Sequence, residues 1–358
     1  MDSRERVFLA LDHQEPDRIP VDFWISNGML RKLEGALGIS KEQFLDNHDV
    51  DFRYIAGPEY AGPALDGNTD IWGVRRTIAE VRMAGGVEHY AEVTDPPLAA
   101  ATSADEIEDY AHWPSPDWFR YDCIKAQCEE VIAAGRVAVF MGDRLNRAAQ
   151  LKPAMYLRGV EQILVDMAVQ PEIAQAVFAR VRAFYVAYLE RILDAAGGKI
   201  DIVLSGDDFG SQNGPLISPA MWDEFLREGF AAYVGVARAA GAKTMHHTCG
   251  SVVPIIPKMI GCGLDVLQSL QPEAAGMAPE ALDAEFGGRL CFQGGVCIQK
   301  TMPFGGRDDI RAAVNRLARV MGKGGGYIFC TSHNIQADTP VENVEALMQA
   351  YREFGGYY

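Results

Sequence analysis

The sequence predicts an α/β fold, a (β/α)8 or TIM barrel with insertions near its N-terminus and in an early loop. Eight short apolar runs recur along the 358 residues, and each is closed by glycine, proline or polar residues. The runs are apolar throughout rather than alternating, which suits parallel strands buried on both faces, and helical patterns lie between them. Composition does not shift along the chain, so residues 1–358 are expected to form a single barrel domain.

The predicted strands leave room for a helix between neighbours, as a parallel sheet requires. In order they are 19-IPVDFW-24, 51-DFRYIA-56, 137-VAVFMG-142, 201-DIVLSG-206, 243-KTMHHTC-249, 264-LDVLQS-269, 290-LCFQGG-295 and 326-GYIFC-330. The interval 57–136 is too long for one crossover. We interpret it as insertions that cover one mouth of the barrel, including 66-DGNTDIWGVRR-76 and the proline-rich turn 112-HWPSPDW-118.

Helical patterns with start and stop signals separate the later strands. Residues 160–198 read as two helices split at Pro171, and Ser218 with Pro219 opens a helix over 220–242. Asp308 opens a helix that runs to glycines near 326, and residues 340–356 form the last one. An open doubly wound sheet would share this alternation, but no G-x-G-x-x-G follows an early strand, which favours the barrel.

Charge and composition exclude several classes of function. The net charge of −16 argues against nucleic acid or an anionic membrane as a general partner, because either would be repelled over most of the surface. The apolar stretches are short and broken, and the N-terminus mixes acidic and basic residues, so neither a membrane span nor a targeting peptide is expected. A cytoplasmic protein is the expectation. The seven cysteines are an odd number, which disfavours a disulfide framework.

Polar residues gather after the predicted strands, and barrel enzymes hold their active sites at the carboxyl ends of the strands. The fifth run supplies His247 and Cys249, and the eighth supplies Cys330 and His333. The third, fourth and seventh runs add the remaining candidates, which are Asp143, Arg144, Arg147, Asp207, Asp208, Gln293 and Cys297.

His247 and Cys249 form the sharpest pair. Residues two apart in an extended strand point to the same side, so both can face one ion while His246 faces the other way. Imidazole and thiolate are ligands that zinc prefers, and a catalytic zinc commonly has three protein ligands. The third could be Cys330 or His333. The plainer alternatives are that the cysteines are core thiols, that His333 is a hydrogen-bonded or capping residue, and that an aspartate braces a turn.

Motifs along nearly the whole chain resemble the uroporphyrinogen decarboxylase superfamily. They are 14-QEPDRIPV-21, 70-DIWGVRR-76, 206-GDDFGSQNGPLISPAMW-222, 247-HTCGSVVPIIPKMIGCGLDVLQSLQP-272 and 324-GGGYIFCTSHNIQADTPVENVEAL-347. The resemblance implies one (β/α)8 barrel. It also implies one of two branches, which are cofactor-free decarboxylases and zinc-dependent methyltransferases of corrinoid systems, such as methylcobalamin:coenzyme M methyltransferases.

The decarboxylase branch is the poorer match. In that branch the first strand is followed by two arginines that hold a substrate with many carboxylates. The corresponding run here is 20-PVDFWISNGMLR-31, which places Asp22 in the strand and offers only Arg31 nearby. An acidic residue at this mouth would repel acidic pyrrole side chains.

The methyltransferase branch resembles this chain at H-x-C-G, which His247, Cys249 and Gly250 match. In that branch these ligands hold zinc together with a later cysteine. Cys330 is the favoured third ligand over His333, because two thiolates and one imidazole make a softer zinc site. From their places at the strand ends, we expect catalytic roles for Asp207, Asp208 and His333, and substrate binding by Gln212, Asp143, Arg147 and Gln293.

The expected activity is methyl transfer between a corrinoid and a small-molecule substrate. The corrinoid is expected on a separate protein, because the chain has no D-x-H-x-x-G signature, and a homodimer is compatible with the resemblance. One alternative is a metal-free decarboxylase or lyase that uses Asp207 or His333 as acid and base. Another is a binding protein whose zinc is structural and held by four protein ligands.

Overall fold

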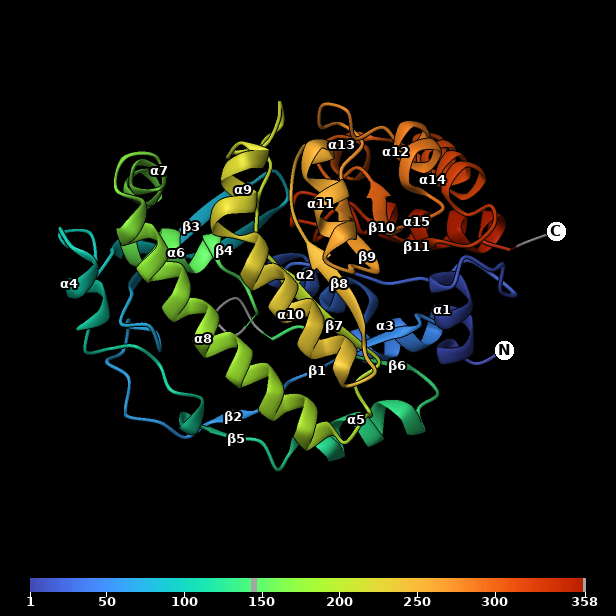
Figure 1. The fold of residues 1–358 in the computed structure, drawn as a ribbon. Coiled ribbons are helices and arrows are strands. Elements are labelled where there is room, and N and C mark those ends of the chain that lie inside the picture. Colours follow the sequence, from blue (N-terminus) through green and yellow to red (C-terminus); the bar gives the residue numbers. More distant parts are fainter. Residues whose placement is uncertain (143–146, 357–358) are drawn as a thin grey trace.

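A seven-stranded parallel sheet forms the centre of the computed structural model, which describes residues 1–142 and 147–356 (Figure 1). The strands follow their sequence order across the sheet, as in a barrel and unlike a doubly wound sheet. Every strand of this sheet overlaps a predicted run, so seven of the predicted strands are confirmed. They are β1 (Phe52–Ile55), β6 (Val137–Phe140), β7 (Ile202–Gly206), β8 (Lys243–His247), β9 (Val266–Leu270), β10 (Cys291–Val296) and β11 (Tyr327–Thr331).

The first predicted strand occupies the eighth position without forming a regular strand. Residues 19–25 lie between the two outer strands: Val21 pairs in parallel with Phe329 of β11, and Asp51, just before β1, donates its N–H to the Val21 carbonyl at 3.0 Å. The prediction of a strand here was wrong, for two reasons. Pro20 has no N–H to donate, and the N–H of Val21 donates to the Asp51 side chain at 2.8 Å instead of to a backbone carbonyl.

Helices pack against the outside of the barrel. The long helix α8 (Pro171–Ala196) lies beside α10 (Arg227–Ala239) across the front of Figure 1. The predicted break at Pro171 is confirmed, because α7 (Val160–Val169) ends two residues earlier. The helix predicted over 220–242 is two helices, α9 (Pro219–Phe225) and α10, since Leu226 between them has φ −114°, outside the helical range.

The remaining helices include two that the sequence predicted near the C-terminus. Those predicted near the C-terminus are α14 (Arg307–Met321) and α15 (Val341–Phe354), which pack on each other. The remainder are α1 (Ser3–Leu11), α2 (Asn27–Leu37), α3 (Lys41–Asn47), α4 (Ala104–Glu108), α5 (Ile124–Ala133), α6 (Leu151–Arg158), α11 (Ile256–Gly261), α12 (Pro279–Phe286), α13 (Thr301–Phe304) and the short 3-10 turns η1 (Pro116–Trp118) and η2 (Val253–Ile255).

The interval 57–136 contains the predicted insertions. It holds the long antiparallel hairpin β3 (Arg75–Met83) and β4 (Gly86–Asp95), and a small pair of strands, β2 (Glu59–Tyr60) and β5 (Phe119–Arg120). The hairpin and the 66–76 element supply lining residues to a cavity at the barrel mouth, namely Asp70, Trp72, Val74, Glu88, His89 and Tyr90. The turn 112–118 instead packs against α8, and none of its residues lines this cavity.

Two apolar clusters account for the continuous apolar character of the strands. The inner one fills the barrel and includes Val139, Leu204, Met245 and Cys330 from alternating strand positions, with Val7 of α1 below. The outer one lies between the strands and the surrounding helices. Because α1 closes the amino-terminal end of the barrel, open space is left at the carboxyl ends of the strands.

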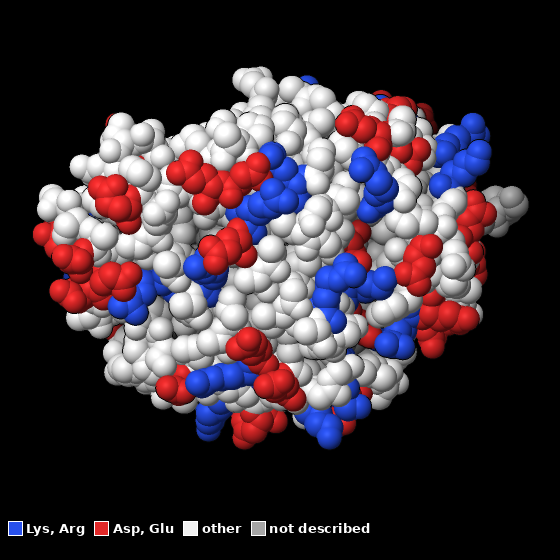
Figure 2. All heavy atoms as spheres, in the orientation of Figure 1, with Lys and Arg blue, Asp and Glu red and all other residues white. Residues whose placement is uncertain are grey.

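The surface drawn in Figure 2 carries charged side chains of both signs. Acidic and basic side chains are interspersed over the face drawn in Figure 2. Within the described residues, no helix is both long and apolar enough to span a membrane.

Candidate metal centre

His247, Cys249 and His333 bring three potential ligand atoms together at the barrel mouth. These atoms all lie within 4.8 Å of one another, and His247 Nε2 is 3.4 Å from Cys249 Sγ. A tetrahedral zinc ion with ordinary bond lengths separates its ligand atoms by roughly 3.3 to 3.8 Å. Small side-chain adjustments therefore suffice for these residues to hold a metal ion.

His246 faces away from this group, as the strand alternation predicts. Its Nδ1 lies 2.8 Å from Ser205 Oγ, and its ring stacks on Phe209 with centroids 5.2 Å apart. Burial lowers the pKa of His246 to about 3, so the ring is neutral at ordinary pH. His246 is a core histidine, and only the second histidine of the pair reaches the site.

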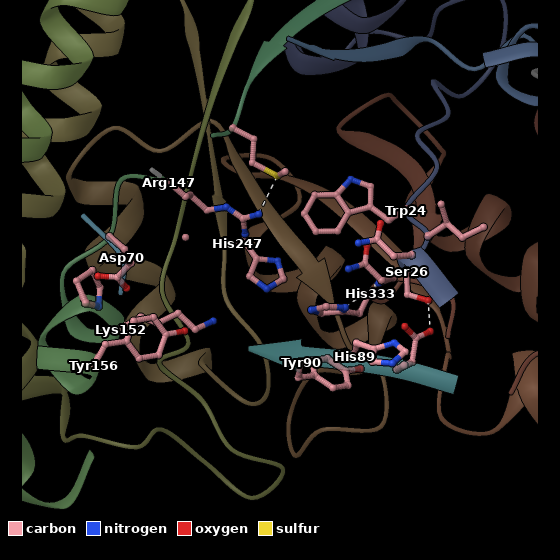
Figure 3. Close-up of a pocket in the computed structure, with 18 of the residues that line it drawn as sticks. Trp24, Ser26, Asp70, His89, Tyr90, Arg147, Lys152, Tyr156, His247 and His333 are labelled. Carbon is pink, nitrogen blue, oxygen red and sulfur yellow. Dashed lines mark hydrogen bonds between the residues drawn. The ribbon is translucent and has the colours of Figure 1, made fainter. Parts of the chain in front are cut away.

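His247 is held in one orientation by two neighbours. The side-chain carbonyl of Gln268, on β9, pairs with Nδ1. Trp24 stacks on the ring at 5.6 Å with an interplanar angle of 15° (Figure 3). A carbonyl can only accept, so Nδ1 carries the hydrogen and Nε2 presents its lone pair toward Cys249. Burial, followed by the nearby His333 and Arg147, holds the pKa of His247 well below its ordinary value, which keeps the ring in the neutral form that binds metals.

Cys249 lies on the turn that follows β8, and Gly250 makes this turn sharp. Gly250 has φ +79°, and an added Cβ would come within 2.5 Å of the Ser211 carbonyl oxygen. Its N–H donates to Gln271 Oε1 at 3.0 Å. The glycine in H-x-C-G is therefore required by the backbone conformation and by the close packing of the 210–211 segment.

The thiol of Cys249 is protonated when no metal is bound. Burial and the adjacent carboxylate of Asp208 raise its pKa to about 12, while Lys152 and Gln271 act in the opposite direction. A metal ion would supply the positive charge that stabilises the thiolate.

His333 reaches the group from the loop after β11. The Thr331 hydroxyl donates to the His333 carbonyl at 2.7 Å, and the N–H of Asn334 donates to His333 Nδ1 at 2.7 Å. Burial lowers the pKa of His333 to about 4, so this ring is also neutral. With Nδ1 accepting, the hydrogen lies on Nε2, so metal binding at either nitrogen requires loss of the Asn334 bond: at Nδ1 the metal takes the lone pair, and at Nε2 the hydrogen must first move to Nδ1.

Cys330 does not join these residues. Its side chain is 1 % exposed and packs in the inner cluster of the barrel. Burial, with Asp22 nearby, raises the pKa of its thiol well above the ordinary value. Side chains alternate along β11, and Cys330 points into the barrel below the mouth, whereas His333 follows the end of the strand. The structure therefore brings His333, and not Cys330, to the other two potential ligands.

The two aspartates after β7 differ in their surroundings. Asp207 accepts the backbone N–H groups of Gln150, Leu151 and Lys152 at 2.5, 3.0 and 2.7 Å, so it anchors the start of α6. Burial raises the pKa of Asp207 to about 6, against these three hydrogen bonds. The structure thus places it as a bracing residue rather than one that faces substrate.

Asp208 lies beside the potential ligands. Its carboxylate pairs with Lys152 Nζ at 2.5 Å, accepts the N–H of Cys249 at 3.3 Å and is 3.7 Å from His247 Nε2. Burial alone would raise the pKa of Asp208, but Lys152, through its charge and its hydrogen bond, holds it below the ordinary value. It is therefore ionised.

The remaining predicted residues are dispersed. Arg147 lines the same cavity as His247, with its guanidinium 5.9 Å from the ring centre of Trp24, and Gln212 is exposed at a second cavity. Gln293 is fully buried and donates to Asp22 at 2.5 Å, so it does not reach the mouth. Asp143 and Arg144 lie outside the described residues.

Sequence reasoning missed Trp24, Gln268, Gln271 and Lys152. Gln268 ends the sixth predicted strand, so the same strand-end argument that selected His247 could have found it. Gln271 follows three residues later and contacts the H-x-C-G turn. For Trp24 and Lys152 the signal was weaker, because an aromatic residue and a lysine near strand ends are common in any barrel.

Two cavities meet at the potential ligands. The first, of about 580 Å³, is lined by His247 and His333, with Trp24, Lys152 and Tyr156 also around it (Figure 3). The second, of about 410 Å³, is lined by Cys249, His333 and Gln212. A bound ion would be accessible from both.

Comparisons with known proteins agree with this architecture. A methyltransferase from Methanosarcina mazei has the same fold, with a TM-score of 0.67, 18% sequence identity and 99% of each chain covered. A methylcobamide:CoM methyltransferase from Methanosarcina barkeri is 28% identical over 47% of this chain and 45% of its own length. A uroporphyrinogen decarboxylase from Coxiella burnetii is 23% identical over 52% of this chain and 48% of its own.

The curated relatives thus have two different activities, and the chain spans about half of the length of each. The sequence pattern of the uroporphyrinogen decarboxylase (URO-D) family matches residues 90–354, which is most of the chain and includes every potential metal ligand. The chain belongs to the uroporphyrinogen decarboxylase family.

Proposed function

We propose that this protein is a zinc-dependent methyltransferase that moves a methyl group between a corrinoid, carried on a separate protein, and a small substrate. The observation that supports the proposal most strongly is the group formed by His247, Cys249 and His333. It offers two imidazoles and one thiolate at the carboxyl end of the barrel strands, where barrel enzymes hold their active sites.

The residues present fit zinc better than other common metals. Two nitrogen ligands and one sulfur ligand suit zinc, whereas calcium and magnesium prefer oxygen. Three protein ligands would leave a position for a substrate atom. When bound, zinc would hold a substrate thiol in its deprotonated form or withdraw electrons from a coordinated oxygen or nitrogen.

The surrounding residues would position the ligands and the substrate. Gln268 fixes the tautomer of His247, and Asp208 and Gln271 hold the backbone on either side of Cys249. Lys152, paired with Asp208, lines the first cavity together with Arg147. These two cations would orient an anionic group of the small substrate.

The relatives are named for two activities, decarboxylation and methyl transfer, and the site favours methyl transfer. The first cavity is lined by Arg147 and Lys152, but also by the carboxylates Asp70 and Glu88, which does not suit a substrate with many carboxylates. Asp22, which we expected at the mouth, is instead 3 % exposed, and its oxygens accept from Tyr54, Trp24 and Gln293, so it does not contribute to this preference. A decarboxylase would also leave the ligand group without a use.

Metal analysis of matched variants tests the proposal. We expect near-stoichiometric zinc in the purified protein and in Cys330→Ala, and loss of zinc in Cys249→Ala and His333→Ala. The wild type should transfer a methyl group to or from free cobalamin with a thiol, amine or methoxy compound. Retention of both metal and activity by Cys249→Ala would overturn the proposal, as would decarboxylation that survives chelation.

A further inference from the structure

The potential ligand group forms the wall between the two cavities. His333 lines both, whereas His247 lines only the first and Cys249 only the second. A substrate atom held at this wall can therefore be approached from either side. A methyl transfer needs this geometry, because donor and acceptor must lie on opposite sides of the methyl carbon.

The linings of the two cavities differ in chemistry. The first contains two cations and a set of aromatic side chains, which are Trp24, Trp72, Tyr90, Tyr156 and Tyr185. The second is lined, within the described chain, by no lysine or arginine. Besides the carboxylate of Glu273, its polar groups are mainly amides and hydroxyls, contributed by Gln212, Gln271, Gln299, Ser211 and Ser332.

Each cavity also has one buried hydroxyl that lacks a partner among the described residues. Tyr156 OH lines the first cavity and Ser332 Oγ lines the second. Ser332 is only 2 % exposed. A buried hydroxyl without a hydrogen bond is costly, so both groups are placed to bind a polar atom of a ligand.

We propose that the two cavities are separate sites for the two substrates, an assignment that rests on the proposed methyltransferase function. The second cavity receives the corrinoid. The methyl-bearing face of the corrinoid lies across the mouth of this cavity, and the neutral amide side chains of the corrinoid bind to Ser332 and the glutamines. The first cavity holds the small substrate, whose anionic or aromatic portion suits Arg147, Lys152 and the aromatic residues.

The transfer step is balanced with these two substrates alone. For a thiol acceptor, the thiol loses its proton to solvent and a sulfur lone pair forms the new S–C bond. The Co–C bond breaks, and both of its electrons stay on cobalt, which is reduced from Co(III) to Co(I). The reverse direction uses the same atoms.

Two single-hydroxyl deletions test the assignment. Ser332→Ala is expected to raise KM for methylcobalamin about three- to tenfold, the usual range for one lost hydrogen bond, with KM for the small acceptor unchanged. Tyr156→Phe should show the opposite pattern. Equilibrium dialysis with hydroxocobalamin gives a readout that does not depend on turnover, and only Ser332→Ala should weaken binding by the same factor.

Controls separate this assignment from the proposed function. Because Ser332 adjoins His333, zinc content must be measured in each protein. It should be equal in both variants and the wild type. Gln299→Trp, at an exposed position that is not adjacent to a ligand, should narrow the second cavity and also weaken cobalamin binding. Failure of the wild type to transfer methyl groups would refute the function itself. An active wild type in which both deletions raise KM for the same substrate, or in which Ser332→Ala and Gln299→Trp change nothing, would refute the two-site assignment.

Discussion

Gln268 determines which nitrogen of His247 faces the other potential ligands. Its side-chain carbonyl occupies Nδ1, and Trp24 prevents the ring from turning by stacking on it. Such supporting contacts are as important to a metal site as the ligands, since they set both orientation and basicity.

Removal of the Gln268 carbonyl should therefore weaken zinc binding. We expect Gln268→Leu to lower zinc affinity by about 10- to 100-fold, the usual effect of losing the partner of a ligating histidine. Gln268→Glu keeps an acceptor at Nδ1 and should retain much of the affinity. Competition with a chromophoric chelator measures both. Equal affinity in Gln268→Leu and the wild type would show that the contact does not position His247.

His246 should make the folded state less stable in acid. Its pKa is about 3 in the folded protein, against an ordinary 6.5, because its ring is buried. Below pH 6.5 the unfolded chain binds a proton that the folded chain does not bind until about pH 3, so stability is lost as pH falls through this window. Between pH 7 and pH 5 this one group contributes a loss of about 2 kcal/mol.

Urea unfolding of chelated protein at the two pH values measures this effect. The other buried histidines add losses of the same sign, so the comparison needs a variant without this ring. His246→Asn cannot titrate, and its loss between pH 7 and pH 5 should be smaller than that of the wild type by about 2 kcal/mol. Identical losses would mean that His246 is protonated in the folded state.

At the scale of elements, the turn after β8 is the part of the fold that makes the site. The strand alternation places His247 and His246 on opposite sides, but Cys249 lies beyond the last strand residue, and its position depends on the turn at Gly250. The neighbouring 210–211 segment packs directly on this turn, since a Cβ on Gly210 would come within 2.6 Å of the Cys249 carbonyl oxygen.

Substitution of Gly250 should disturb the site more than substitution of a comparable glycine. Gly250→Ala combines the left-handed φ with a clash at the Ser211 carbonyl oxygen. Gly241→Ala has a similar φ of +82° but nothing within 4 Å of the added carbon. Gly241→Ala should cost about 1 kcal/mol and keep zinc, whereas Gly250→Ala should cost more and lose zinc. Equal unfolding free energies and equal zinc contents would contradict this interpretation of the turn.

At the scale of the whole molecule, the sequence predicted the barrel because each strand of the parallel sheet is a short, mostly buried run with helices before and after it. The one run that failed, 19–24, contains Pro20 and an N–H that is taken by the Asp51 side chain, so apolar character alone could not show that it forms only isolated bridges to its neighbours. Its place in the barrel was nevertheless correct, because it fills the position between β11 and β1.

The site was predictable where strand geometry controls it and not where loops do. His247 and Cys249 follow from the two-residue period around the end of β8. The choice between Cys330 and His333 depended on where β11 ends and how residues 331–333 turn, which spacing does not determine. Asp207 looked catalytic because it ends a strand, but its hydrogen bonds to the start of α6 require tertiary structure to be seen.

X-ray absorption at the zinc edge of the purified protein would identify the atoms that bind the metal at the barrel mouth. We expect about one zinc per chain with one sulfur at about 2.3 Å and the remaining nitrogen and oxygen ligands at about 2.0–2.1 Å. Two sulfur ligands would restore Cys330 as a ligand, and the absence of bound zinc from protein prepared without chelator would contradict the metal centre itself.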